Sequence, residues 1–90
     1  MESLEKILEE IREERKHQDK KWGGPNHDDQ HDPYAWAAFV TNYLGQALSD
    51  FVNESGQYEA RYRKWRYNMV KVAALAVAAI EVVDRKLKDE

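Results

Sequence analysis

The amino-acid sequence predicts an all-α protein, an antiparallel bundle of three main helices. Three observations predict this class. Apolar residues recur at intervals of three and four along three long segments, glycine and proline separate the first segment from the second, and the short turn NESGQ separates the second from the third. Because a short connection leaves consecutive helices side by side, the second and third helices should pack antiparallel.

The first helix is expected to begin after Ser3, a suitable N-cap, and to run towards Lys20. Its apolar stripe consists of Leu4, Ile7, Leu8 and Ile11. The same helical spacing, continued along the segment, reaches Arg15, Gln18 and Trp22. The face that should be buried therefore becomes polar towards the end of the helix. This change fits either a helix end that projects into water or a helix that lines a pocket.

The second helix follows the segment GGPNHDDQHDP, which we predict to be a loop because its glycines and first proline stop the preceding helix. Asp32 and Pro33 are suited to the N-cap and first position of the second helix, which should run to about Val52. Its broad apolar face consists of Trp36, Phe39, Val40, Tyr43, Leu44, Ala47 and Phe51.

The third helix, from about Tyr58 to Lys88, carries two apolar stripes. The first consists of Tyr58, Tyr62, Trp65, Met69, Val72, Ala76 and Val83, and the second of Val70, Ala73, Val77 and Ile80. Three helices cannot easily cover both stripes, and a chain of this length buries only about 60 to 65% of its unfolded surface. We therefore expect the bundle to be completed by oligomerisation, as a homodimer or homotetramer.

The composition is that of a soluble globular domain, with 42% apolar and 34% charged residues and no cysteine. Disulfides and thiolate metal sites are therefore excluded. The longest apolar run, MVKVAALAVAAIEVV, is interrupted by Lys71 and Glu81, so we expect no membrane span. The acidic start, MESLEKILEE, lacks a secretory signal pattern, and we expect a cytoplasmic location.

A basic window between residues 58 and 71 could attract an anion, although the net charge of the chain is −3. Nucleic acid is not the expected partner. The aromatic residues of this window, Tyr58, Tyr62 and Trp65, share one helical stripe, which packing explains better than base stacking.

Four polar residues are expected to converge between the second and third helices. If the turn centres near Ser55, Asn42 lies thirteen residues before it and Asn68 thirteen residues after it. Gln46 shares the face of Asn42, and Lys71 follows Asn68 by about one turn. From spacing alone, these residues could be exposed, form a satisfied polar layer, or line a ligand site.

Three stretches resemble a known family. They are ERKHQDKKWGGPNH, in which an arginine and a glutamine precede KWG and NH; DPYAWAAFVTNYLGQAL, a tryptophan-containing helix; and RYNMVKVAALAVAAIEVVDR. In this order they resemble the conserved motifs of the MazG-like nucleotide pyrophosphohydrolases, an all-α family of bacteria and phages. The likeness covers about residues 12 to 85, and it implies a single MazG-like helical domain over residues 1–90.

The resemblance also implies a lost metal site. The family's Glu-Glu-x-x-Glu motif, which holds magnesium against a nucleoside triphosphate, maps onto Asn42, Tyr43 and Gln46, and its next acidic motif maps onto Asn68 and Lys71. None of these residues is acidic. Magnesium prefers anionic oxygen ligands, and Lys71 would repel it while being able to pair with a phosphate.

We therefore expect a metal-free pocket, without a cofactor or catalytic residue, that binds a nucleotide or nucleotide-derived signal without hydrolysis. Such a protein could be a phage-type scavenger that keeps the signal from a host receptor. The expected ligand-binding residues are Arg15, Gln18, Lys21, Trp22, His27, Asn42, Tyr43, Gln46, Asn68 and Lys71.

Two alternatives stay open. The chain could be an active nucleoside triphosphate pyrophosphohydrolase with relocated metal ligands such as Asp28, His31 or Glu81, or a structural helical oligomer without a ligand. Imidazole and carboxylate groups suit zinc or manganese, so a replacement metal site within the predicted loop is a further possibility. Its candidate ligands are His27, Asp28, Asp29, His31 and Asp32.

Overall fold

The fold is all-α, as predicted. The computed structural model describes residues 2–54 and 56–88, and within these ranges it contains four helices and no strand. The helices are α1 (Glu2–Trp22), α2 (Pro25–Asp28), α3 (Pro33–Asn53) and α4 (Tyr58–Lys88). None of the helices in these ranges combines the length and apolar character needed to cross a bilayer.

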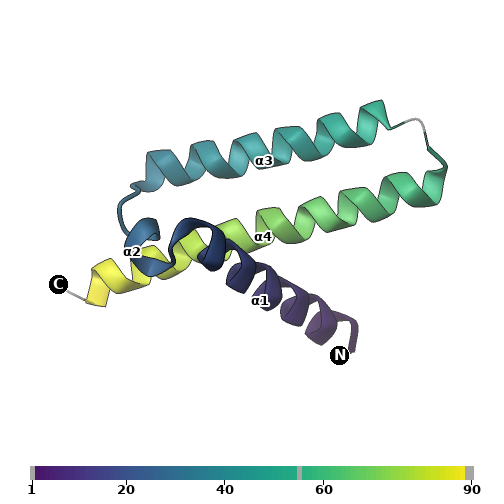
Figure 1. Ribbon diagram of the computed structural model, residues 1–90. Coiled ribbons are helices and arrows are strands. Elements are labelled where there is room, and N and C mark those ends of the chain that lie inside the picture. The colour runs from purple at the N-terminus through teal and green to yellow at the C-terminus, as the bar shows by residue number, and fades with distance from the viewer. Residues whose placement is uncertain (1, 55, 89–90) are drawn as a thin grey trace.

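The long helices α3 and α4 form an antiparallel hairpin, which Figure 1 shows as two neighbouring rods joined by a short connection. The start of α3 agrees with the prediction, since Pro33 is its first residue and the side chain of Asp32 accepts a hydrogen bond from the backbone N–H of Ala35 at 2.9 Å. The bounds of α4 also agree with those predicted.

The first helix, α1, packs against α4 and crosses it at an angle, so that its N-terminal end projects away from the hairpin (Figure 1). The two helices are connected by ion pairs between Arg66 and Glu10 at 2.6 Å and between Arg15 and Glu81 at 3.0 Å. The predicted apolar stripe near the N-terminus of α1 is left largely uncovered, with Leu4, Ile7 and Leu8 exposed.

The segment predicted to be a loop contains the one-turn helix α2, so that prediction was wrong over residues 25–28. The reason is local. Gly23 and Gly24 adopt positive φ angles of 101° and 71°, which reverse the chain after α1, and Pro25 then occupies the first helical position, where its missing N–H costs nothing.

The core lies between α3 and α4. The core residues of α4 form one line along the helix, and this line belongs to neither of the two apolar stripes that were predicted. The buried apolar residues are Trp36, Ala47, Ala74, Leu75, Ala78 and Val82. The indole of Trp36 packs against Leu75, Ala78 and Val82. Alanines on this line allow α3 to approach α4 closely, whereas larger residues of the predicted stripes, such as Tyr58 and Ile80, are exposed.

Candidate functional site

A cavity of about 240 Å³ lies where the end of α1 and the short helix α2 meet the α3–α4 hairpin. It is lined by Trp22, His27, Asp28, Trp36, Phe39, Tyr43 and Leu75. We call it the aromatic pocket. Three of its residues, Trp22, His27 and Tyr43, were predicted to bind a ligand. The other four were not, because Trp36 and Phe39 were assigned to packing, Asp28 was considered only as a metal ligand, and Leu75 was assigned no role.

The aromatic rings of the pocket contact one another and hold its walls in place. Trp22 stacks against His27 with ring centroids 6.4 Å apart, and it meets the edge of Tyr43 at 6.5 Å. Trp36 and Phe39, which also line the pocket, pack edge to face at 5.7 Å. Such pairs favour fixed ring orientations, so the pocket presents flat apolar surfaces.

Two residues of the aromatic pocket carry buried polar atoms that lack a hydrogen-bond partner within residues 2–54 and 56–88. They are Trp36 Nε1, a donor, and Asp28 Oδ2, an acceptor, on residues that are only 7% and 4% exposed. Asp28 Oδ2 has a charged neighbour, since it lies 3.6 Å from Arg15 Nη2. A buried polar atom without a hydrogen bond costs about 1 to 3 kcal/mol.

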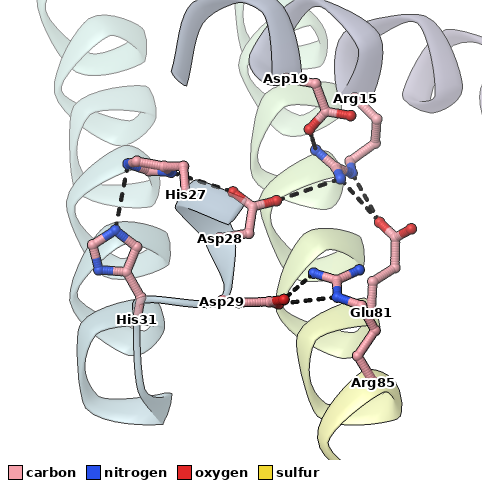
Figure 2. Close-up of polar contacts among 8 residues, drawn as sticks. All are labelled: Arg15, Asp19, His27, Asp28, Asp29, His31, Glu81 and Arg85. Atoms are coloured by element: carbon pink, nitrogen blue, oxygen red, sulfur yellow. Dashed lines mark hydrogen bonds and ion pairs between the residues drawn. The ribbon is translucent and has the colours of Figure 1, made fainter. Parts of the chain in front are cut away.

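Arg15 lies among three carboxylates, which Figure 2 shows converging on its guanidinium group. Its nitrogens are 3.1 Å from Asp19, 3.0 Å from Glu81 and 3.6 Å from Asp28. Arg85 connects α4 to the residue that follows α2, because its Nη2 atom lies 2.7 Å from the carboxylate of Asp29. Arg15 therefore joins α1, α2 and α4 and contributes to the pocket by holding Asp28 in its wall.

Gln18, another predicted ligand-binding residue, is buried beneath the same region. Its Nε2 atom donates to the backbone carbonyl oxygen of Lys71 at 3.4 Å, while its Oε1 atom has no hydrogen-bond partner within the described ranges. The polar turn of α1 that was noted in the sequence thus faces α4 and the pocket region, and does not project into water.

A second polar cluster lies between α3 and α4, and it is centred on an acid that the sequence analysis missed. Gln46 donates to Asp50 Oδ1 at 2.9 Å, and Asn68 donates to Asp50 Oδ2 at 3.2 Å. Gln46 and Asn68 therefore converge as predicted. Asn42 is exposed and lies eight residues before Asp50, about 12 Å along the helix, so the structure does not bring it level with Asn68.

The amide groups lower the pKa of Asp50. The hydrogen bond from Gln46 has the largest effect, burial opposes it, and the hydrogen bond from Asn68 and the charges of Lys64 and Lys71 add to it. The sequence offered a signal for this role, because Asp50 follows Gln46 by one helical turn.

Two lysines that were predicted to bind the ligand lie over aromatic rings. Lys21 Nζ is 5.3 Å from the ring centroid of Trp22, and Lys71 Nζ is 4.5 Å from that of Tyr67. Lys71 also precedes the pocket residue Leu75 by one turn of α4. Lys21 therefore places a positive charge beside a ring of the aromatic pocket, whereas the ammonium group of Lys71 lies over Tyr67, which does not line the pocket.

The histidines and acids of residues 27–32 form pairwise contacts. His27 Nδ1 lies 3.4 Å from Asp28 Oδ1, and His27 Nε2 lies 3.4 Å from His31 Nε2 (Figure 2). In the part of the chain that the structure describes, no group of three or more histidines and acids is arranged to hold a metal ion. Asp28 and Glu81, two of the possible relocated ligands, both contact Arg15.

The structure thus distributes seven of the ten predicted site residues over three groups. Trp22, His27 and Tyr43 line the aromatic pocket, Arg15 and Gln18 lie in the contacts beside it, and Gln46 and Asn68 bind Asp50. Comparison of the chain with protein-family models, curated proteins and solved structures found no match in any of the three.

Proposed function

We propose that this protein binds a nucleotide, or a signal derived from one, and leaves it intact. The observation that carries the proposal is the aromatic pocket, whose lining includes Trp36 with its buried indole N–H. A nucleobase has the matching features, because it offers a flat π surface for the rings and hydrogen-bonding groups along its edge. Stacking on aromatic side chains contributes about 1 to 3 kcal/mol per base.

The size of the aromatic pocket indicates which part of the ligand it accepts. Its volume is about 240 Å³, below the roughly 300 to 1,000 Å³ of pockets that enclose drug-sized ligands. The pocket therefore suits one base, while the sugar and phosphate remain outside. Lys21 beside Trp22 and Lys71 one turn from Leu75 are the candidate partners for the phosphate, through charge-assisted hydrogen bonds.

The polar cluster around Asp50 supports binding without hydrolysis. Positions that resemble the metal ligands of the MazG-like family hold Gln46 and Asn68, and both amides are already hydrogen-bonded to Asp50. The charges of Lys64 and Lys71 act on the same carboxylate. Magnesium favours several anionic oxygens, so one carboxylate shared by two amides and opposed by two cations is a poor ligand set.

We therefore propose that the protein is a catalytically inactive, MazG-like helical domain that sequesters its ligand in the cytoplasm, as a phage-type scavenger would. Self-association completes its bundle, and the exposed apolar residues of α3 and α4 support this part of the proposal. Sequestration requires that binding be tight and that the bound molecule be released unchanged.

The test is titration calorimetry of the purified protein with nucleoside mono- and triphosphates and cyclic dinucleotides, in EDTA and in magnesium. We expect at least one compound to bind equally in both buffers and to be recovered intact by chromatography. Pyrophosphate release that requires magnesium or manganese would instead identify an active hydrolase. Failure of the whole panel to bind, with no small molecule in the native mass spectrum, would identify a structural oligomer.

A further inference from the structure

Two histidines meet beside the aromatic pocket, His27 from α2 and His31 from the segment between α2 and α3. Their Nε2 atoms lie 3.4 Å apart, and Figure 2 shows a ring nitrogen of each facing the other. The backbone between them is turned, since the amides of Gln30 and His31 donate to the carbonyl oxygens of His27 and Asp28, each at 3.2 Å. The local fold therefore brings the two imidazoles together.

Neighbouring aromatic rings limit the movement of both imidazoles. His27 stacks against Trp22 with ring centroids 6.4 Å apart. His31 meets Phe39 edge to face at 5.0 Å and Trp36 at 6.1 Å. Both histidines are nevertheless partly exposed, so an ion from solution can reach the nitrogens between them.

The separation of the two nitrogens suits a single metal ion. Zinc binds imidazole nitrogen at about 2.0 to 2.1 Å in tetrahedral geometry, which places two such nitrogens about 3.3 to 3.4 Å apart. The Nε2 atoms of His27 and His31 are 3.4 Å apart. Only a small rotation of the rings is then needed for both nitrogens to bind the same ion.

Asp28 is placed to orient His27 for this role. Its Oδ1 atom lies 3.4 Å from His27 Nδ1, on the side of the ring away from His31. Metal-binding histidines commonly donate their other ring N–H to a carboxylate, which fixes the tautomer that leaves the ligating nitrogen unprotonated. Asp28 is itself buried and lies 3.6 Å from Arg15, so the carboxylate is held in position.

The type of ligand indicates which class of ion would bind. Imidazole nitrogen suits zinc, copper and nickel, whereas magnesium and calcium favour oxygen. The negative charges of Asp28 and Asp29 are offset by Arg15 and Arg85, so the local charge does not select for hard cations.

The histidine pair is remote from the polar cluster around Asp50. His31 contacts Trp36, and Asp50 follows Trp36 by fourteen residues of α3, which is about 21 Å along the helix. A metal bound by the histidines would therefore be distinct from one bound at the amides of Gln46 and Asn68.

We propose that His27 and His31 together bind one zinc ion through their Nε2 atoms, with water completing the coordination. The ion joins α2 to the segment that precedes α3, and it fixes His27 in the wall of the aromatic pocket. The proposal concerns the metal alone, so it can be tested without a nucleotide and does not depend on the proposed function.

The test is titration calorimetry of the protein, prepared without a histidine tag, with zinc chloride. His17, the third histidine of the sequence, is exposed on α1 and provides the matched control. We expect the unmodified protein and His17→Ala to bind one zinc ion per chain with the same affinity. His27→Ala and His31→Ala should each bind about tenfold or more weakly, because one imidazole then acts alone.

Two calorimetric results would overturn the proposal. Failure of the unmodified protein to bind zinc would show that the two rings only share a hydrogen bond. Equal affinities of all three variants would place the ion elsewhere on the surface. Magnesium chloride, titrated in the same way, should give no binding to the histidine pair.

A measurement on the unmodified protein covers the case in which a histidine variant fails to fold. The ring nitrogens of all three histidines are followed by ¹⁵N NMR as zinc chloride is added. The Nε2 signals of His27 and His31 should change together and reach their limit at one equivalent, while those of His17 stay constant. A change at only one of the pair, or an equal change at His17, would refute a shared ion.

Discussion

Asn68 on α4 donates a hydrogen bond to Asp50 on α3, with 3.2 Å between Nδ2 and Oδ2. This bond joins residues eighteen positions apart in the chain and helps to determine how α3 and α4 slide relative to one another. Arg61 has a similar effect nearer the turn, since its guanidinium donates to the backbone carbonyl oxygen of Phe51 at 3.1 Å. A polar contact between otherwise apolar helices favours one register, because any other would leave its groups unpaired.

Removal of the Gln46 amide should raise the pKa of Asp50. The hydrogen bond from Gln46 is the largest cause of the lowered pKa, so Gln46→Ala should move the carboxyl titration towards its ordinary value. The titration can be followed by carbon-detected NMR of the Asp50 side chain. Asn42→Ala is the matched control, since Asn42 is an exposed amide on the same helix and should leave the titration unchanged. Equal shifts of the Asp50 pKa in the two variants would contradict the role of Gln46 in the cluster.

The lowered pKa of Asp50 also predicts how stability depends on pH. A carboxyl whose pKa is lower in the folded state contributes stability above its unfolded pKa, and this contribution is lost as the pH falls through the folded value. The difference in unfolding free energy between the unmodified protein and Asp50→Asn should therefore be constant above about pH 5 and shrink below about pH 4. Urea denaturation at a series of pH values measures it. A difference that grows on acidification would have the wrong sign.

Arg15→Met should destabilise the fold far more than Arg12→Met. Both arginines lie on α1, but the Arg15 side chain is 13% exposed and contacts the buried Asp28, whereas Arg12 is 67% exposed and pairs with the exposed Glu9. Loss of a buried pair costs about 3 to 5 kcal/mol, and we expect about 2 to 3 kcal/mol here because Asp19 and Glu81 remain partly solvated. The exposed pair should contribute about 1 kcal/mol or less. Urea denaturation of both variants checks this, and similar losses would contradict the role of Arg15.

The helices could be predicted because the signals that limit them are local. Asp32 and Pro33 begin α3 through a cap and a fixed φ angle, which depend only on neighbouring residues. The one-turn helix α2 was missed because the same glycines and proline that end a helix also allow a single turn to follow.

Local signals could not predict which residues of α4 form the core or how α3 and α4 are aligned along their lengths. Both depend on contacts between segments that are distant in the sequence. Ala74 and Ala78 have little apolar surface, so larger residues such as Tyr62 dominated the sequence pattern although they remain exposed. Asp50 was overlooked for a related reason. Its role depends on Asn68 reaching it from α4, and a register estimated from the turn alone placed Asn42 there instead.

Tyr43→Ala should weaken nucleotide binding by about tenfold or more, because stacking contributes about 1 to 3 kcal/mol per base and Tyr43 supplies part of the pocket wall. Tyr34→Ala is the control, since Tyr34 lies on the same helix and is almost fully exposed. Calorimetry should give an unchanged stoichiometry for both variants, which excludes partial unfolding as the cause. Equal affinities of the two variants would remove the aromatic pocket from the binding site.

Lys71→Gln should weaken binding of a nucleotide but not of the corresponding nucleoside. If Lys71 pairs with the phosphate, its removal deletes a charge-assisted hydrogen bond and reduces the dependence of affinity on salt concentration. Binding of the nucleoside depends on the base alone and should not change. Lys16→Gln, an exposed lysine on α1 that pairs with Glu13, serves as the control for the loss of one positive charge. Equal losses for nucleotide and nucleoside would show that Lys71 acts through the fold, whereas an unchanged nucleotide affinity would leave Lys21 as the phosphate partner.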